Sequence, residues 1–176
     1  MSTIRDISDQ LLLGPRVRQN HALEHATIAL LSPRHPKVVF TGRSTANGFY
    51  VWGRVDQEAV RRAADEALQR LRTTEPDMAI HPRCGTNLAV AAVMAGVGAV
   101  AAGQIPPQRN RYSRGVLASL GALAVAQPVG FFVQRHFTTL TPRVSLRVMD
   151  VTPKHGVFGA GYFVRTSHEV ESEGRK

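Results

Sequence analysis

The sequence predicts an α+β fold, in which a small mixed sheet with packed helices is joined to a two-helix apolar hairpin that crosses a membrane. Two observations lead to this class. Helical and extended patterns occur in both the first and the last part of the chain. Between them, residues 88–103 contain no charged or strongly polar side chain, and residues 116–133 contain only Ser119, Gln127 and Pro128 as interruptions.

This pattern predicts an inserted hairpin rather than two successive domains. Residues 1–87 and 135–170 together are expected to form the α+β domain and to carry the functional site. Residues 88–133 form the hairpin, and residues 171–176 form a charged, frayed tail.

Composition supports a folded protein with a core. The chain has 176 residues, 43% of them hydrophobic, and a net charge of +9 from 22 Lys+Arg against 13 Asp+Glu. The cations are spread along the chain and form no run of five, so nucleic acid is not expected as a partner. A single cysteine, Cys84, excludes an internal disulfide.

The N-terminal part is predicted to be helical. Residues 4–13 have apolar positions on one side, and Gly14-Pro15 interrupts them. Residues 17–31 are apolar around much of the helix circumference, which predicts a buried helix. Ser32-Pro33 is expected to end it, because proline cannot continue the hydrogen-bonded ladder.

Two extended runs, 37–41 and 49–53, follow this helix and predict a β-hairpin. The turn-rich segment 42–48 is expected to be its loop. Residues 78–80 are predicted to add a short third strand.

A second helix is predicted over residues 57–72, with Asp56 as its N-cap. The polar segment 81–87 then forms a loop, and Thr86 or Asn87 is expected to cap the first apolar helix.

The apolar runs are joined by residues 104–114, which carry three Arg. Their lengths are close to the lower limit for a membrane span, and their lack of charge favours a transmembrane hairpin over a buried soluble pair. Small residues recur four apart, as in Ala92 and Gly96, which favours close helix packing and a homo-oligomer in lipid. The expected partner of residues 88–133 is the lipid bilayer.

The chain returns to extended patterns after this hairpin. Apolar residues alternate over 144–149, and a Gly-rich run with aromatics covers 157–165. Residues 153–156 are expected to form a turn between them, so that a second β-hairpin joins the first in one sheet.

The strongest candidate for chemistry is His21-x-x-Glu24-His25. On a helix the two histidines are four apart and project from one face, a spacing that offers two imidazoles to one metal ion. Glu24 lies beside them, close enough to act on a metal-bound water. The same order of residues is the inverzincin signature.

A second candidate cluster is His81-x-x-Cys84. Imidazole and thiolate are common zinc ligands, and catalytic zinc takes three protein ligands with one open position. His21, His25 and Cys84 would form such a Zn²⁺ site, with His81 replacing or joining Cys84. The following helix N-terminus would favour the thiolate form of Cys84.

Other interpretations of these residues remain open. With four ligands the site would be closed and structural, and Glu24 would orient a ligand. Cys84 with a histidine could instead form a nucleophile–base dyad.

The two segments Asn20–Ala26 and His81–Asn87, followed by apolar helices, resemble a group of uncharacterised bacterial membrane-associated families. These families carry a His-x-x-Glu-His box and a later His-Pro-x-Cys-Gly-Thr box, and are suspected metal-dependent enzymes. The resemblance implies His21, His25, His81 and Cys84 as ligands and Glu24 as the acid/base.

The function expected from the sequence is that of a membrane-anchored zinc-dependent hydrolase, with peptide or amide bonds as substrates by analogy to metallopeptidases. The rival is a non-catalytic membrane-associated α+β module with a structural metal or none, acting in assembly; a soluble basic binding domain ranks third. The N-terminus lacks a signal-peptide pattern, so the expected location is the bacterial cell membrane with the soluble part in the cytoplasm.

Overall fold

The structure is a computed structural model that describes residues 14–156 and 159–168. It divides into two compact units. One combines residues 1–80 with 137–176, and the other comprises residues 81–136. The helix predicted over 4–13 and the predicted tail 171–176 lie outside the described residues.

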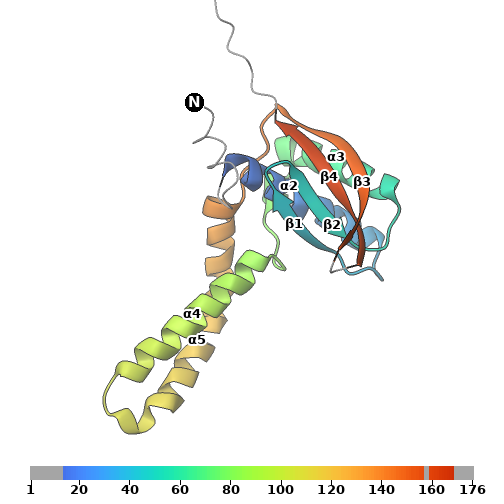
Figure 1. Ribbon diagram of the computed structural model, residues 1–176. Coiled ribbons are helices and arrows are strands. Elements are labelled where there is room, and N and C mark those ends of the chain that lie inside the picture. Colours follow the sequence, from blue (N-terminus) through green and yellow to red (C-terminus); the bar gives the residue numbers. More distant parts are fainter. Residues whose placement is uncertain (1–13, 157–158, 169–176) are drawn as a thin grey trace, which may run out of the picture. The chain divides into compact units, whose positions relative to one another are not determined.

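The first unit has the predicted α+β architecture (Figure 1). Its described helices are α2 (Pro15–Arg34) and α3 (Gln57–Thr73), with a short 3-10 helix at Pro76–Ala79. Its strands are β1 (Thr41–Thr45), β2 (Gly48–Trp52), β3 (Leu146–Gly156) and β4 (Gly159–His168), in the order β1-β2-β4-β3. The two β-hairpins therefore join in one sheet, as predicted, and every described pair is antiparallel rather than of mixed direction.

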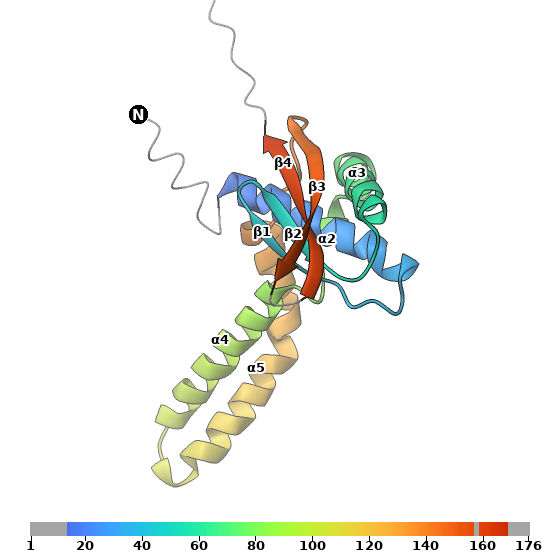
Figure 2. The same ribbon diagram turned by 45° about the vertical axis from the view of Figure 1, so that its right-hand side comes forward.

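The two helices cover one face of the sheet (Figure 2), α2 against β1 and β2 and α3 against β3 and β4. Side chains alternate between the faces of each strand, so every second residue enters the core. The most deeply buried apolar side chains are Leu23, Leu31, Phe49, Val51, Val60, Leu71, Leu146 and Val164.

The first β-hairpin differs from the prediction. Strand β1 begins at Thr41 and includes most of the segment predicted as a loop, and only Ala46 and Asn47 separate it from β2. Gly42 and Ser44 are typical of turns, but pairing with the aromatic strand β2 and packing on α2 place them in a strand. Residues 78–80 were expected to be extended; Met78 and Ala79 instead end the 3-10 helix.

Helix boundaries show a similar effect of context. Helix α2 continues through Pro33 and ends at Arg34, so the expected stop at Ser32-Pro33 is wrong by one or two residues. Helix α3 begins as predicted, because the Asp56 carboxylate accepts the Ala59 amide at 2.7 Å.

The C-terminal hairpin is longer than predicted. Residues 153–156 were expected to turn, but they continue β3 and pair with β4 from Tyr162 to Gly159. A register shift between Val148 and Asp150 marks a β-bulge.

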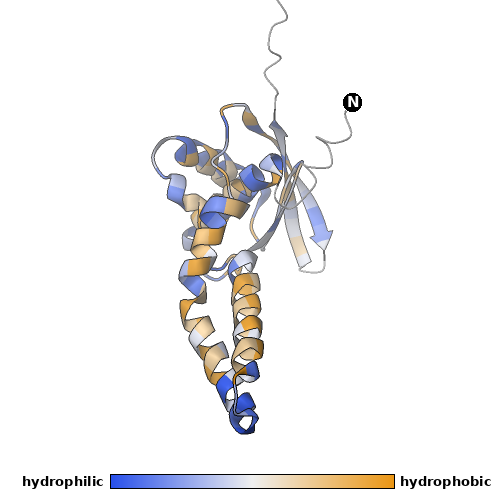
Figure 3. Cartoon of the chain, turned by 90° about the vertical axis from the view of Figure 1, so that its left-hand side faces the viewer, coloured by the Kyte–Doolittle hydropathy of each residue, from blue (hydrophilic) through white to orange (hydrophobic). Residues whose placement is uncertain are grey.

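The second unit is the helical hairpin of α4 (Gly85–Gln104) and α5 (Arg111–Val133). Its helices are apolar and its connecting turn is hydrophilic (Figure 3), and both helices are long and apolar enough to cross a membrane. The helices touch where glycines remove side chains: a Cβ on Gly98 would lie 3.3 Å from the Ala118 carbonyl oxygen, and one on Gly115 would lie 3.2 Å from that of Ala99. Large apolar side chains remain exposed, including Leu88, Val93, Val97, Val100, Val116, Leu117 and Leu120.

Candidate metal centre

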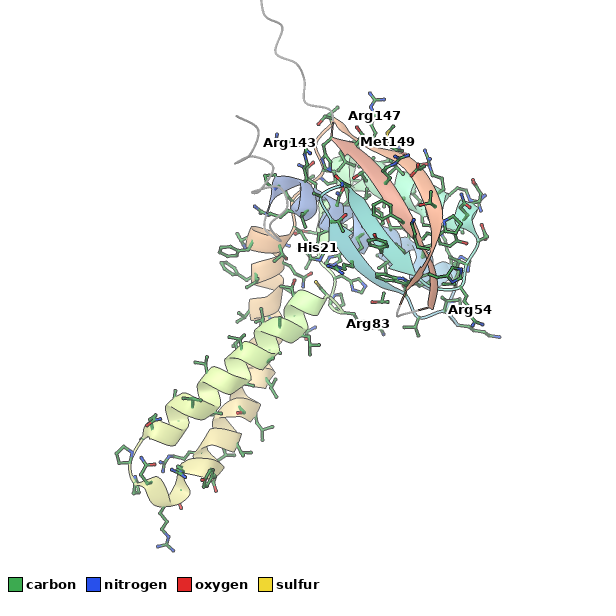
Figure 4. All side chains as sticks on the ribbon, in the orientation of Figure 1. His21, Arg54, Arg83, Arg143, Arg147 and Met149 are labelled. Carbon is green, nitrogen blue, oxygen red and sulfur yellow. The ribbon has the colours of Figure 1, made fainter. Side chains whose placement is uncertain are left out.

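Helix α2 places two imidazoles together. His21 and His25 lie one turn apart, with ring centroids 4.3 Å apart and ring planes at 63°. His25 is buried and His21 is partly exposed on the helix (Figure 4). The sequence prediction that both rings share one helix face is therefore confirmed.

Backbone carbonyls determine which nitrogen of each ring can bind a cation. His25 Nδ1 lies 2.7 Å from the Ala79 carbonyl oxygen, and His21 Nδ1 lies 2.9 Å from that of Thr138. A carbonyl oxygen only accepts hydrogen bonds, so each Nδ1 must carry the proton. The Nε2 atoms then hold the lone pairs, and such an orienting Nδ1–H···O=C bond is the usual companion of a metal-bound histidine.

Glu24 is the buried carboxylate of the same helix. Ser44 Oγ donates a hydrogen bond to its Oε2 at 2.5 Å. Gly42 leaves space for its other oxygen, since a Cβ at residue 42 would lie 2.3 Å from Glu24 Oε1. Burial raises the pKa of Glu24 to about 7, although the nearby His21 and the Ser44 hydrogen bond lower it in part. A carboxyl group with such a pKa can both accept and release a proton near neutral pH.

Sequence reasoning missed the residues that hold this part of α2 in place. Asn20 is fully buried; its amide nitrogen donates to the carbonyl of Thr45 at 2.8 Å, and its oxygen accepts from Thr166 Oγ1 at 2.8 Å. A signal was present, because Asn20 is a polar residue in an otherwise buried helix, four positions before Glu24. Ser44 gives no such signal, because it lies in the turn-rich segment 42–48 that the sequence predicts to be a loop.

In the hairpin unit, Cys84 caps helix α4. Its sulfur accepts the Thr86 amide at 3.3 Å, so the N-cap is Cys84 rather than Thr86 or Asn87. The described residues thus include two imidazoles in the α+β unit, His21 and His25, and one thiol in the hairpin unit, Cys84, and donors of these types could bind a metal ion.

Asn87, predicted as a cap, instead holds the loop before α4. Its amide nitrogen donates to the carbonyls of His81 and Pro82 at 3.3 and 2.9 Å, and its oxygen accepts from Gln134 at 2.6 Å. Gly130 makes room for this contact, because a Cβ there would lie 2.2 Å from Asn87 Oδ1. The start of α4 and the end of the hairpin are thereby joined.

His81 has the opposite proton arrangement to the two histidines of α2. Its Nδ1 accepts the Arg83 amide at 3.2 Å, so in the neutral ring the proton lies on Nε2. Binding of a metal by His81 would require one of these nitrogens to change its partner or its proton. Its role as a ligand stays a prediction.

The fold and site therefore define an α+β protein with an apolar helical hairpin and donors suited to a metal ion. Residues 16–151 match a protein family described as a domain of unknown function (DUF6391), and the chain belongs to this family. It is also 39% identical over 138 residues to an uncharacterized protein of Picosynechococcus sp.. The aligned region covers 72% of this chain and 67% of the relative. No solved structure matches the chain.

Proposed function

We propose that the protein is a membrane-anchored zinc protein in which His21 and His25 bind the ion through Nε2 and Cys84 binds it through its thiolate. The tautomers of the two imidazoles support this assignment. Chain connectivity supports it as well. The Ala79 carbonyl accepts a hydrogen bond from His25. The five residues from Ala79 to Cys84 can span at most about 18 Å, which limits how far Cys84 can lie from Ala79. Three ligands would leave one coordination position for water or substrate.

We propose further that the site hydrolyses peptide or amide bonds, with Glu24 as the acid/base. The observation that carries this proposal is the buried carboxyl of Glu24, held by Ser44 beside the histidine pair. Zinc would supply a Lewis acid and lower the pKa of bound water. Glu24 would accept the proton of the attacking water and pass it to the departing amine nitrogen.

Metal analysis combined with a Glu24→Gln variant tests this function. Protein purified without chelator should contain about one equivalent of zinc, and Cys84→Ser should weaken its binding. Glu24→Gln should keep the metal but lose zinc-dependent cleavage of a peptide library, typically by 10²-fold or more for a lost acid/base. Glu58→Gln, which changes an exposed carboxylate, is the matched control. Wild-type protein that binds zinc but cleaves no peptide or amide would refute the hydrolase.

A second candidate is a non-catalytic module in which the metal is structural. The burial of His25 and Cys84, 4% and 8% exposed, favours it, because a closed site needs no access for substrate. Zinc held by four protein ligands, with His81 as the fourth, would identify this role. Loss of the metal should then unfold the protein, and Glu24→Gln should leave its assembly unchanged.

We propose that the hairpin spans a bilayer with the α+β unit in the cytoplasm. Arg114 donates to the carbonyls of Ala102, Ile105 and Pro107, so its charge is tied to the turn. The turn also carries Arg109 and Arg111. The segments that flank the opposite ends of the two helices carry more cations than the turn: Arg70, Arg72, Arg83, Arg135, Arg143 and Arg147. The positive-inside tendency places the side with more cations in the cytoplasm.

Labelling of single cysteines tests this topology. In a Cys84→Ser background, a cysteine at Gln108 should react with a membrane-impermeant maleimide in intact cells, whereas one at Glu58 should react only after lysis. The reverse pattern would refute this topology.

We also propose that a second copy of the chain is a partner in lipid. A Cβ on Gly96 or Gly121 would meet nothing within 4 Å, which leaves small-residue faces open for another helix.

A further inference from the structure

Both ends of the helical insertion are attached to helix α2 at the histidine pair. The chain leaves the α+β unit after Ile80. The residue before it, Ala79, accepts a hydrogen bond from His25 through its backbone carbonyl. It returns at Phe137, and the carbonyl of the next residue, Thr138, accepts from His21. Two segments 59 residues apart in sequence thus meet adjacent imidazoles.

The returning segment continues along α2 through further hydrogen bonds. Arg18 donates from its guanidinium to the Thr139 carbonyl at 3.1 Å, and its own carbonyl accepts the Leu140 amide at 3.1 Å. The Arg143 amide then donates to Gln19 Oε1 at 3.0 Å. One helix therefore holds the exit and the return of the insertion, and the two imidazoles lie at both attachments.

We propose that metal binding at His21 and His25 is coupled to the attachment of these two segments, so that an ion bound by the imidazoles tightens the hold of α2 on both ends of the hairpin. This inference rests on the proposed metal site but not on the hydrolase activity. A cation on Nε2 withdraws electron density from the ring and makes the Nδ1–H a stronger donor to Ala79 and Thr138.

Linkage makes the effect reciprocal. If metal stabilises the attached state, then attachment of the two segments raises the metal affinity by the same factor. A hairpin inserted in a bilayer would thus influence metal affinity in the α+β unit through these two attachments, in addition to the thiolate of Cys84. The ligand class is a divalent ion that accepts imidazole nitrogen, with zinc as the probe.

Hydrogen exchange on the full-length protein in lipid nanodiscs, with zinc or with a chelator, tests the coupling. The Ile80 amide, bonded to Asp77, and the Leu140 amide, bonded to Arg18, report the two attachments. Both should exchange about tenfold more slowly with zinc, within the usual range of allosteric coupling. The amide of Val164, in the centre of the sheet, should change by less than about twofold.

Two variants make the result specific. His21→Ala removes the donor to Thr138 and should speed exchange at Leu140 more than at Ile80, even without metal. His155→Ala, which removes an exposed histidine from β3, should behave as wild type.

Three results would overturn the coupling. Calorimetry that detects no zinc binding would refute both the metal site and the coupling. Zinc binding with unchanged exchange at Ile80 and Leu140 would refute the coupling alone. Equal slowing at Val164 would show global stabilisation instead of a local attachment.

Discussion

Replacement of Glu24 by glutamine should stabilise the metal-free protein at high pH. Glutamine keeps an oxygen that can accept from Ser44 but cannot ionise. Burial raises the pKa of Glu24 from 4.5 to about 7, so between these pH values the unfolded chain has lost a proton that the folded chain keeps. Unfolding then releases a proton, and wild-type stability falls as the pH rises through this window and levels off above it.

The size of the effect follows from the same pKa. A change from 4.5 to about 7 corresponds to about 3 kcal/mol at most. Glu24→Gln should therefore match the wild type near pH 4.5 and exceed it by up to about 3 kcal/mol at pH 8.

Urea unfolding with chelator present measures this difference. Trp52 is the only tryptophan of the chain and lies in β2, so its fluorescence follows the α+β unit. Glu58→Gln, with an exposed carboxylate, should show no such pH-dependent gain. Parallel stability profiles for wild type and Glu24→Gln from pH 4.5 to 8 would refute the claim that burial controls this carboxyl.

Substitutions at three further positions test other contacts of the fold. Gly42→Ala should destabilise the α+β unit by about 1–3 kcal/mol, because the new Cβ overlaps the carboxyl of Glu24; unchanged urea unfolding would contradict this packing. Asp56→Ala should cost about 1 kcal/mol through loss of the α3 cap, whereas Asp56→Asn should retain most of the stability. Asn87→Ala should cost about 1–3 kcal/mol and speed amide exchange at the start of α4, because Gln134 loses its acceptor; equal exchange rates would argue against this contact.

Much of the α+β fold was predictable because its signals are local. The cap at Asp56 and the four-residue spacing of His21 and His25 need only helix geometry, and the structure confirms both. The apolar hairpin was equally evident from its lack of charge.

The surroundings of Glu24 were not predictable, because they depend on tertiary packing. Gly42 and Ser44 resemble loop residues in sequence, and only pairing with β2 places them in a strand that faces α2. The carbonyls of Ala79 and Thr138 gave no signal at all, since any residue carries a backbone oxygen. Sequence patterns therefore identified the candidate side chains of helix α2 but missed the groups that orient them.

The close contact of α4 with α5 limits how this part of the protein can evolve. Gly98 and Gly115 lie against backbone carbonyls of the opposite helix, and Ser119 donates its hydroxyl to the carbonyl of Ala95 at 3.0 Å. An alanine at either glycine would require the opposite backbone to give by a few tenths of an ångström, and a larger residue would push the helices further apart. Natural variants should therefore accept many apolar residues on the outer surfaces of the pair, but only the smallest ones along this line of contact.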